Sequence, residues 1–215
     1  MTSGRFIALE GGEGAGKSTQ ARLLADALRA RGIDAVVTRE PGGTPGAEAI
    51  RKLLLEGAPG DGGAGWNPRA EALLFAAARS DHVEQLIRPA MARGAWVVCD
   101  RFLDSSRAYQ GGGGGLSDAD ILTLHAIGSR GFLPDLTLLI EVAPAIAAER
   151  LALRDTDGTD RIGGRDTAYH ERVAKAFSTF ADNEPHRFAR VDGNGTPDET
   201  HARVLAALAP LLGPA

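Results

Sequence analysis

The residues with the clearest chemistry lie between Phe6 and Gln20, in the stretch FIALEGGEGAGKSTQ. This stretch matches the pattern G-x-x-x-x-G-K-[ST], in which glycines let successive backbone N–H groups turn inward around an anion. The helix that follows such a loop presents its positive N-terminus to the same anion, while the lysine reaches the outer phosphates of a nucleotide. We therefore predict a binding site for a nucleoside triphosphate. The predicted contacts are Gly11, Gly12, Glu13, Gly14, Ala15, Gly16, Lys17, Ser18 and Thr19.

Strands and helices alternate along the rest of the chain. Short apolar runs predict strands at 6–9, 34–40, 95–100, 136–142 and 188–193. Apolar residues at helical spacing predict helices at 17–32, 44–57, 68–94, 117–130, 145–153 and 196–212, and one more helix that ends at about residue 183. Pro89 predicts a kink or break in the helix at 68–94. Such alternation indicates a parallel sheet covered on both faces. The sequence therefore predicts one α/β domain over 1–215, with a five-stranded parallel sheet between two layers of helices.

Polar motifs follow four of the predicted strands. They are the glycine-rich loop, TREPGG, DRFLDSS and VDGNG. Because ligands bind beyond the carboxyl ends of parallel strands, we expect these motifs to meet in one cleft. Asp100 closes an apolar strand, where a carboxylate holds Mg²⁺ or its waters, and the hydroxyl of Ser18 is the second predicted magnesium ligand.

Composition narrows the function classes. The chain has 215 residues, is 43% hydrophobic and carries a net charge of −4, so it lacks the overall basic character of a nucleic-acid-binding protein. Its one cysteine, Cys99, excludes an intrachain disulfide and a cysteine-based zinc cluster, and is expected to be a buried strand thiol. Neither a membrane span nor a secretory leader is evident, so the expected location is the cytoplasm, without a membrane partner.

Several motifs in a fixed order resemble those of the thymidylate kinases: EGGEGAGKST, TREPGGTPGAEAIR, LLFAAARSDH, DRFLDSSRAYQG and the late DRIGGR. The resemblance covers essentially the whole chain. It implies the three-layer P-loop kinase fold of the nucleoside monophosphate kinases. It also implies phosphorylation of dTMP to dTDP with Mg²⁺-ATP, a role in dTTP biosynthesis, and the homodimer that is typical of the family.

The same resemblance implies an acceptor site. Phe75 would stack on the thymine, although spacing alone favours a core residue, and Arg79, on the same helical face, would donate to a base carbonyl. Arg101 would grip the acceptor phosphate with its planar guanidinium. The other implied contacts are Glu13 at the 3′-hydroxyl, Arg39 and Glu40 for positioning, Ser105 or Ser106 with Gln110 at the base edge, and Tyr109 against the 2′ position. The Glu40–Pro41 bond is a candidate cis peptide.

The bacterial type of the family carries arginines in a lid. Some relatives have an arginine inside the phosphate-binding loop, but this chain has Gly14 and Ala15 there. The segment RDTDGTDRIGGR supplies Arg154, Arg161 and Arg165, and we expect a mobile lid at about 154–166. The predicted catalytic residues are Lys17, Arg101, Arg154 and Arg161.

The chain departs from the family pattern at two places. Gly163 stands where relatives often have a glutamate, and the glycine run 111–115 is longer than the usual turn, which suggests a mobile loop. Two other functions remain open. A kinase of the same fold could act on another nucleoside monophosphate or a small alcohol, but Phe75, Arg79, Tyr109 and Gln110 favour thymidylate. A GTP-operated switch would need an Asn-Lys-x-Asp motif, and none of the lysines follows an asparagine.

Overall fold

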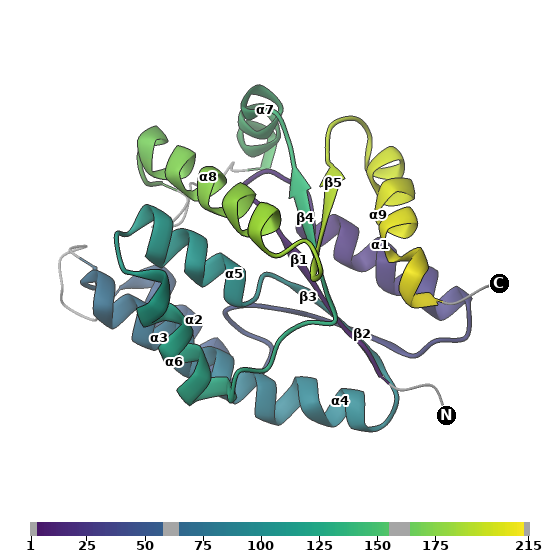
Figure 1. Cartoon of the computed structure of the whole chain (residues 1–215), viewed down its shortest axis with the longest axis horizontal. Coiled ribbons are helices and arrows are strands. Elements are labelled where there is room, and N and C mark those ends of the chain that lie inside the picture. The colour runs from purple at the N-terminus through teal and green to yellow at the C-terminus, as the bar shows by residue number, and fades with distance from the viewer. Residues whose placement is uncertain (1–3, 58–64, 155–163, 213–215) are drawn as a thin grey trace.

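Figure 1 shows a computed structural model of the chain, which describes residues 4–57, 65–154 and 164–212, apart from the Arg154 side chain. Its centre is a five-stranded sheet in the order β2-β3-β1-β4-β5, and all neighbouring strands are parallel. The strands are β1 (Phe6–Glu10), β2 (Ala35–Arg39), β3 (Trp96–Asp100), β4 (Leu136–Glu141) and β5 (Phe188–Asp192). The predicted five-stranded parallel sheet is confirmed.

Helices cover both faces of this sheet, as Figure 1 shows. Because side chains alternate along a strand, Ile7 and Leu9 of β1 pack on one face in a cluster that includes Leu24 and Leu208. Phe6 packs on the opposite face, in a cluster that includes Ile87 and Phe102. The helices are α1 (Lys17–Ala30), α2 (Pro45–Glu56), α3 (Pro68–His82), α4 (Arg88–Ala92), α5 (Leu103–Ser106), α6 (Asp118–Ser129), α7 (Pro144–Arg154), α8 (Thr167–Asn183) and α9 (Pro197–Leu212), with π-helical turns η1 (Val83–Ile87) and η2 (Arg107–Gly113).

Two helical segments differ from the sequence prediction. The long helix predicted over 68–94 is divided into α3, η1 and α4, and Pro89, which has no N–H to donate, stands in the first turn of α4. The segment after β3 was predicted only as a polar motif, but it forms α5 and η2. The predicted Ser117 cap is confirmed, because its side chain accepts from the Asp120 N–H at 3.1 Å.

The glycine run 111–115 has a packing role that the sequence did not suggest. A Cβ at Gly112 would lie 2.6 Å from the Cβ of Ala176 on α8, and one at Gly113 would lie 2.5 Å from the Tyr169 ring. The absence of side chains therefore lets η2 lie directly against α8. Residues 58–64 and 155–163, of which the second segment includes Arg161 and Gly163, lie outside the described residues.

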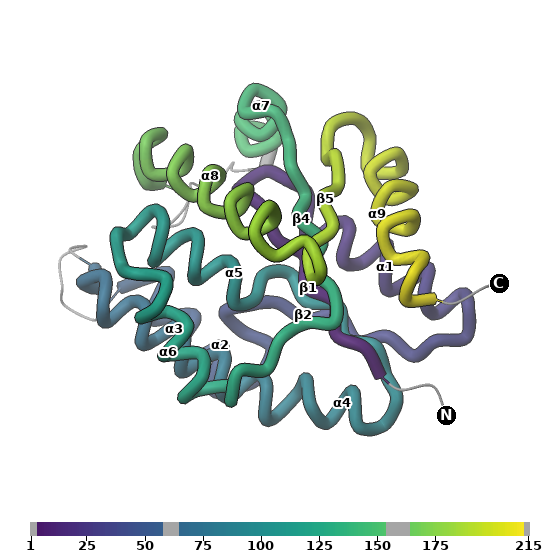
Figure 2. Tube along the Cα trace, viewed as in Figure 1, coloured from purple at the N-terminus to yellow at the C-terminus, as the bar shows by residue number. Residues whose placement is uncertain are grey.

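The segments that follow β1, β2 and β3 are distant in the sequence but adjacent in the fold (Figure 2). The Arg101 N–H donates to the Leu9 carbonyl at 2.9 Å, and the Glu40 N–H donates to the Asp100 carbonyl at 2.9 Å. Three of the polar motifs are therefore held at one edge of the sheet, as the parallel topology predicts.

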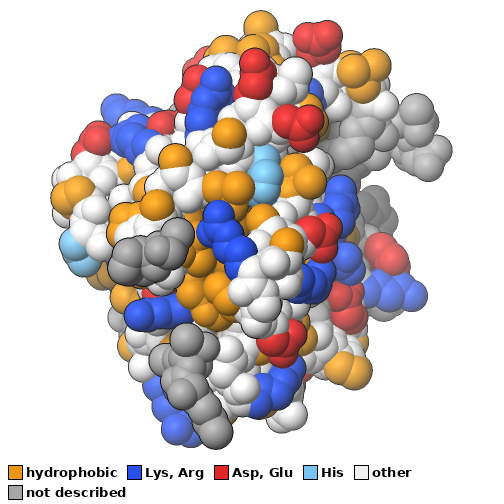
Figure 3. Space-filling model, turned by 90° about the vertical axis from the view of Figure 1, so that its right-hand side faces the viewer, with side chains coloured by type: hydrophobic (Ala, Val, Ile, Leu, Met, Phe, Trp, Pro, Cys, Tyr) orange, Lys and Arg blue, Asp and Glu red, His pale blue; other side chains and the backbone are white. Residues whose placement is uncertain are grey.

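Neither the helices of the described residues nor the face drawn in Figure 3 suggests a membrane-spanning or strongly charged protein. No helix within the described ranges is long and apolar enough to cross a bilayer. In Figure 3, basic and acidic side chains are interspersed with hydrophobic ones. Cys99 is buried, as predicted, and burial raises the pKa of its thiol well above the ordinary value.

Candidate active site

A cleft of about 870 Å³ lies beyond the carboxyl ends of the strands. It is lined by most of the residues predicted for the two nucleotides: Glu13, Gly14, Ala15, Gly16, Lys17, Ser18, Thr19, Arg39, Glu40, Phe75, Arg79, Asp100, Arg101, Ser105, Ser106, Tyr109 and Gln110. Gly11 and Gly12 belong to the same loop and turn their carbonyls toward Lys17. The side chain of Arg154 and all of Arg161 lie outside the described residues, so their predicted roles stay predictions.

The glycine-rich loop has the backbone geometry that its sequence predicts. Gly11 has φ 140°, and a Cβ there would lie only 2.3 Å from the Ile140 carbonyl oxygen. Gly16 has φ 87° at the start of α1, a left-handed conformation that side chains disfavour. These positions therefore favour glycine, and they bring the N-terminus of α1 to the floor of the cleft.

Lys17 is buried and folded back onto the loop. Its Nζ donates to the Gly12 carbonyl at 2.6 Å and to the Gly11 carbonyl at 3.1 Å. Burial, followed by the positive charge of Arg101, lowers the pKa of Lys17 to about 8. An anion in the loop would favour the charged amine and would replace these carbonyls as its partner.

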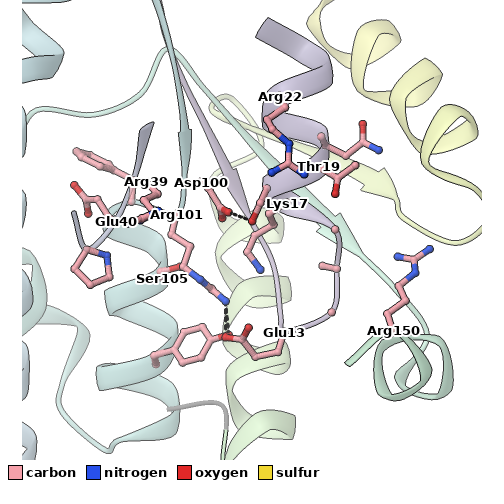
Figure 4. Close-up of a pocket in the computed structure, with 18 of the residues that line it drawn as sticks. Glu13, Lys17, Thr19, Arg22, Arg39, Glu40, Asp100, Arg101, Ser105 and Arg150 are labelled. Carbon is pink, nitrogen blue, oxygen red and sulfur yellow. Dashed lines mark hydrogen bonds and ion pairs between the residues drawn. The ribbon is translucent and has the colours of Figure 1, made fainter. Parts of the chain in front are cut away.

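Ser18 and Asp100 meet as the sequence predicted. The Ser18 hydroxyl donates to Asp100 Oδ2 (Figure 4), whereas the buried Asp100 Oδ1 has no hydrogen-bond partner in the described part of the chain. A hydroxyl beside a carboxylate, with one carboxylate oxygen still unsatisfied, fits Mg²⁺, which prefers oxygen ligands and keeps several waters and phosphate oxygens. Within the described residues no cluster of three acidic, histidine or cysteine side chains could hold a metal alone.

Arg101 lies at the middle of the cleft, where Figure 4 shows it pointing toward Glu13. Its backbone has φ 71°, which is uncommon for a residue with a side chain. Its guanidinium donates to Glu13 at 2.6 Å and to the hydroxyls of Ser105 and Tyr109 at 3.1 Å. Burial alone would lower the pKa of Arg101, but Tyr109, Glu13 and two further carboxylates raise it above the ordinary value. Arg101 is thus a fixed cation, partnered by a carboxylate of the phosphate-binding loop.

Glu10 fixes the segment that follows Arg101, a role that sequence reasoning missed. This fully buried carboxylate ends β1 and accepts from the N–H groups of Phe102 at 2.8 Å and Ser105 at 3.0 Å, and from the Ser105 hydroxyl at 2.5 Å. Burial and the charge of Asp104 raise its pKa to about 7. The signal was its acidic type at the end of an otherwise apolar strand.

Arg79 is held with one nitrogen left for the cleft. Its Nε donates to Glu40 at 2.7 Å, and its Nη2 donates to the Ser106 hydroxyl at 2.7 Å and to the Phe102 carbonyl at 3.3 Å. The second Glu40 oxygen lies 3.1 Å from His82 Nδ1, so both oxygens of this carboxylate are engaged. Glu40 therefore orients Arg79, and Arg79 Nη1 has no protein partner among the described residues. The Glu40–Pro41 bond is cis, as predicted.

The other acceptor-side residues differ in how many contacts they already make with other protein groups. Phe75 lines the cleft, is half-buried and belongs to none of the core clusters, so the prediction of a ligand-facing ring fits its position better than a core role. Ser105 is engaged by Glu10 and Arg101, whereas Ser106 lies beside Arg79. Arg39 forms an exposed pair with Glu48 at the rim.

The cleft also includes residues that the sequence did not single out. Arg150 of α7 donates to the carbonyls of Gly193 at 3.0 Å and Gly195 at 2.8 Å. Figure 4 places Arg150 on the opposite side of the phosphate-binding loop from Arg39 and Glu40, and the loop after β5 contributes Gly195 beside it. The signal was the four-residue spacing between Arg150 and the predicted lid residue Arg154, which is the spacing of neighbours on a helix face.

Arg165 does not line the cleft. It belongs to the segment predicted as a lid, and it donates to Glu71 of α3 at 2.6 Å and lies over the ring of Tyr169 at 4.6 Å. Among the described residues, Arg165 thus contacts α3 on the acceptor side of the cleft.

The comparisons with known proteins agree with this geometry. The family model for thymidylate kinase matches residues 9–204. Over 209 residues the chain is 61% identical to a thymidylate kinase of Rhizorhabdus wittichii, covering 97% of this chain and 99% of that one. It is 46% identical to a thymidylate kinase of Caulobacter vibrioides, covering 99% and 100%. The crystal structure of thymidylate kinase from Ehrlichia chaffeensis superposes with a TM-score of 0.77 at 30% identity, covering 96% of this chain and 100% of the other.

Proposed function

The chain belongs to the thymidylate kinase family, and on that premise we propose that its cleft transfers the γ-phosphoryl group of ATP to the 5′-phosphate of dTMP, giving dTDP and ADP. The observation that carries the proposal is the position of Arg101. This cation lies between the phosphate-binding loop, through Glu13, and the acceptor side, through Ser105 and Tyr109. A guanidinium there would bind the phosphate that receives the transferred group.

On the donor side, the loop and the N-terminus of α1 would hold the β- and γ-phosphates of ATP. Lys17 would turn from the Gly11 and Gly12 carbonyls to the phosphate oxygens, a short movement because its Nζ already lies at the loop. Arg150 and Gly195 line the cleft on the side of the phosphate-binding loop opposite the acceptor residues, which supports an adenine site there.

Mg²⁺ is part of the proposal because Ser18 and Asp100 offer the oxygen ligands it prefers. When bound, the ion would neutralise negative charge on the phosphate oxygens. The residues that would hold it are Ser18 directly and Asp100 directly or through water.

On the acceptor side, Phe75 would stack on the base and Arg79 Nη1 would donate to a base carbonyl. When the 5′-phosphate binds Arg101, it would take over part of the interaction that Glu13 now makes, which leaves the Glu13 carboxylate for the sugar 3′-hydroxyl. Tyr109 donates to Glu13 at 3.1 Å and so lies where the sugar would bind.

Phosphoryl transfer between these sites needs positioning and positive charge more than covalent chemistry. The acceptor phosphate is already an anionic nucleophile, so no general base is needed. Lys17 and Arg101 would supply charge from the described part of the chain, and Arg154 and Arg161 of the lid would supply the remainder. By analogy with other arginine fingers, the lid arginines would contribute about 10³- to 10⁵-fold in rate.

The test is a coupled assay of ADP release with Mg²⁺-ATP and the purified full chain. dTMP, dUMP, dGMP, AMP and CMP are compared with no acceptor, and Lys17→Ala is the control. We expect the fastest turnover with dTMP and loss of turnover in the variant. If turnover depended on Lys17 but were fastest with another nucleotide, the assignment of the phosphate-binding loop would stand and dTMP would be refuted as the acceptor. Turnover without any acceptor would indicate an ATPase.

A homodimer and a cytoplasmic location belong to the same proposal. Leu73 of α3 and Leu122 and Ile127 of α6 are exposed by 56%, 39% and 76%, on two helices that pack together. These apolar side chains support an interface on α3 and α6. Light scattering of the purified chain and of Ile127→Glu tests it, and a monomer at all concentrations would contradict it. The single buried thiol is compatible with a reducing compartment.

A further inference from the structure

Gln110 is one of the most buried polar side chains on the acceptor side. It is 2% exposed and lines the cleft with Phe75, Arg79 and Ser106. Its amide carries both a donor and an acceptor, so the group that faces a ligand depends on what holds the other end. This orientation decides whether the protein offers the base an N–H or a C=O.

Glu71 of α3 decides that orientation. Its Oε1 lies 2.9 Å from the amide nitrogen of Gln110, and its Oε2 accepts from Arg165 at 2.6 Å. A carboxylate with a guanidinium on one oxygen can only accept on the other, so Gln110 must present its NH₂ to Glu71. The amide oxygen has no protein partner among the described residues and is left for the cleft.

Arg165 keeps the carboxylate in place from outside the cleft. Its second nitrogen donates to the Tyr169 hydroxyl at 2.5 Å, and its guanidinium lies over the same ring. The Tyr169 hydroxyl in turn donates to the Tyr109 carbonyl at 2.8 Å, in the turn that carries Gln110. Arg165, Glu71 and Gln110 therefore form a chain in which every polar contact has a fixed direction.

We propose that Glu71 and Arg165 are positioning residues for base selection, which fix Gln110 as an acceptor beside the donor Arg79 Nη1. A donor next to an acceptor complements a carbonyl next to a ring N–H, the pattern of thymine and uracil. Cytosine presents the reverse, an amino group next to an unprotonated ring nitrogen, and would leave both groups of the protein unpaired. This inference rests on the proposed function, because it takes the acceptor to be a pyrimidine nucleotide.

The experiment measures kcat/KM for dTMP and for dCMP, which has a base of similar size, with Mg²⁺-ATP and the full chain. In Glu71→Gln the new amide can donate or accept, so Gln110 is free to turn over. We expect the preference for dTMP over dCMP to fall about tenfold or more, since loss of one buried hydrogen-bonding partner has that effect. Arg165→Gln should lower the preference less, because the carboxylate remains.

The Gln110→Ala variant tests whether Glu71 changes the preference for dTMP over dCMP through Gln110. If Glu71 acts through Gln110, adding Glu71→Gln to Gln110→Ala changes the preference by less than about twofold. Glu84→Gln is the matched control, because it removes a carboxylate from the exposed Arg88 pair outside the cleft and should leave the preference unchanged.

Three results would overturn the inference. They are equal losses for both nucleotides in Glu71→Gln, multiplicative effects in the double variant, or a preference that both Arg165→Gln and Gln110→Ala leave unchanged. The last comparison decides the matter even where Glu71→Gln does not fold. Absence of dTMP turnover in the wild-type chain would instead refute the proposed function, so the two failures are distinguishable.

Discussion

Replacing Glu40 by Gln tests whether the buried contacts of Arg79 are what prepare it for a ligand. The side chains of Arg79 and Glu40 are 3% and 4% exposed, and the Nε–Oε2 distance is 2.7 Å. Glutamine keeps the shape but has one acceptor oxygen for two partners, Arg79 and His82, and it leaves the guanidinium charge without a counter-ion. Breaking a buried pair from one side costs about 3–5 kcal/mol, so we expect the free energy of unfolding to fall by about that amount.

The assay combines urea denaturation with steady-state kinetics. A guanidinium that is no longer fixed should lose most of a charged hydrogen bond to the base, about 1.5–3 kcal/mol, so kcat/KM for dTMP should fall about 10- to 100-fold. The KM for ATP should change little, because within the described residues Glu40 is bound to Arg79 and His82, whereas Lys17 is bound to the Gly11 and Gly12 carbonyls of the loop.

The control is Glu56→Gln. Glu56 and Lys52 form a pair on α2 at 3.9 Å with side chains 65% and 73% exposed, so its loss should cost less than about 0.5 kcal/mol. If Glu40→Gln were as stable as this control and used dTMP as well as the wild type, the proposed orientation of Arg79 by Glu40 would be refuted.

Three further predictions concern the donor side and the middle of the cleft. The protonated form of Lys17 is the one that binds phosphate, so kcat/KM for ATP should fall as the pH rises through about 8, while kcat, which reports the complex, should fall only at higher pH; identical profiles would contradict this. Asp100→Asn should raise the Mg²⁺ concentration for half-maximal rate about 10- to 100-fold, measured by Mg²⁺ titration, and an unchanged requirement would remove Asp100 from the metal site. The folded-state pKa of Glu10, about 7, exceeds its ordinary value of 4.5, so the native state binds the extra proton between these values and its stability should fall as the pH rises across them; Glu10→Gln should lack this slope in urea denaturation at about pH 5 and about pH 8.

Much of the fold could be predicted because its signals are local. Apolar runs such as WVVCD of β3 and the helical spacing after Lys17 depend on neighbouring residues, and parallel topology then brings the strand ends to one edge. The segment after β3 was missed because RAYQGGG is rich in glycine, and it is helical only because η2 packs on α8. Tertiary packing overrides weak local propensity there.

The candidate site was predictable where chemistry depends on residue type in a short motif, as for Lys17, Ser18 and Asp100. Glu10 and Arg150 were missed because their roles depend on partners far away in the sequence. Glu10 accepts from Phe102 and Ser105, and Arg150 donates to Gly193 and Gly195. No local pattern encodes such contacts.

The sequence by itself determined the phosphate-binding loop, the order of strands and helices and the family to which the chain belongs, because each depends on residue types at short spacing. Only the tertiary structure decided which way the polar groups face. Arg165 binds Glu71 across 94 positions, and Glu71 fixes Gln110 across 39. The direction of a hydrogen bond depends on what stands at its other end, and that is known only when distant segments are packed together.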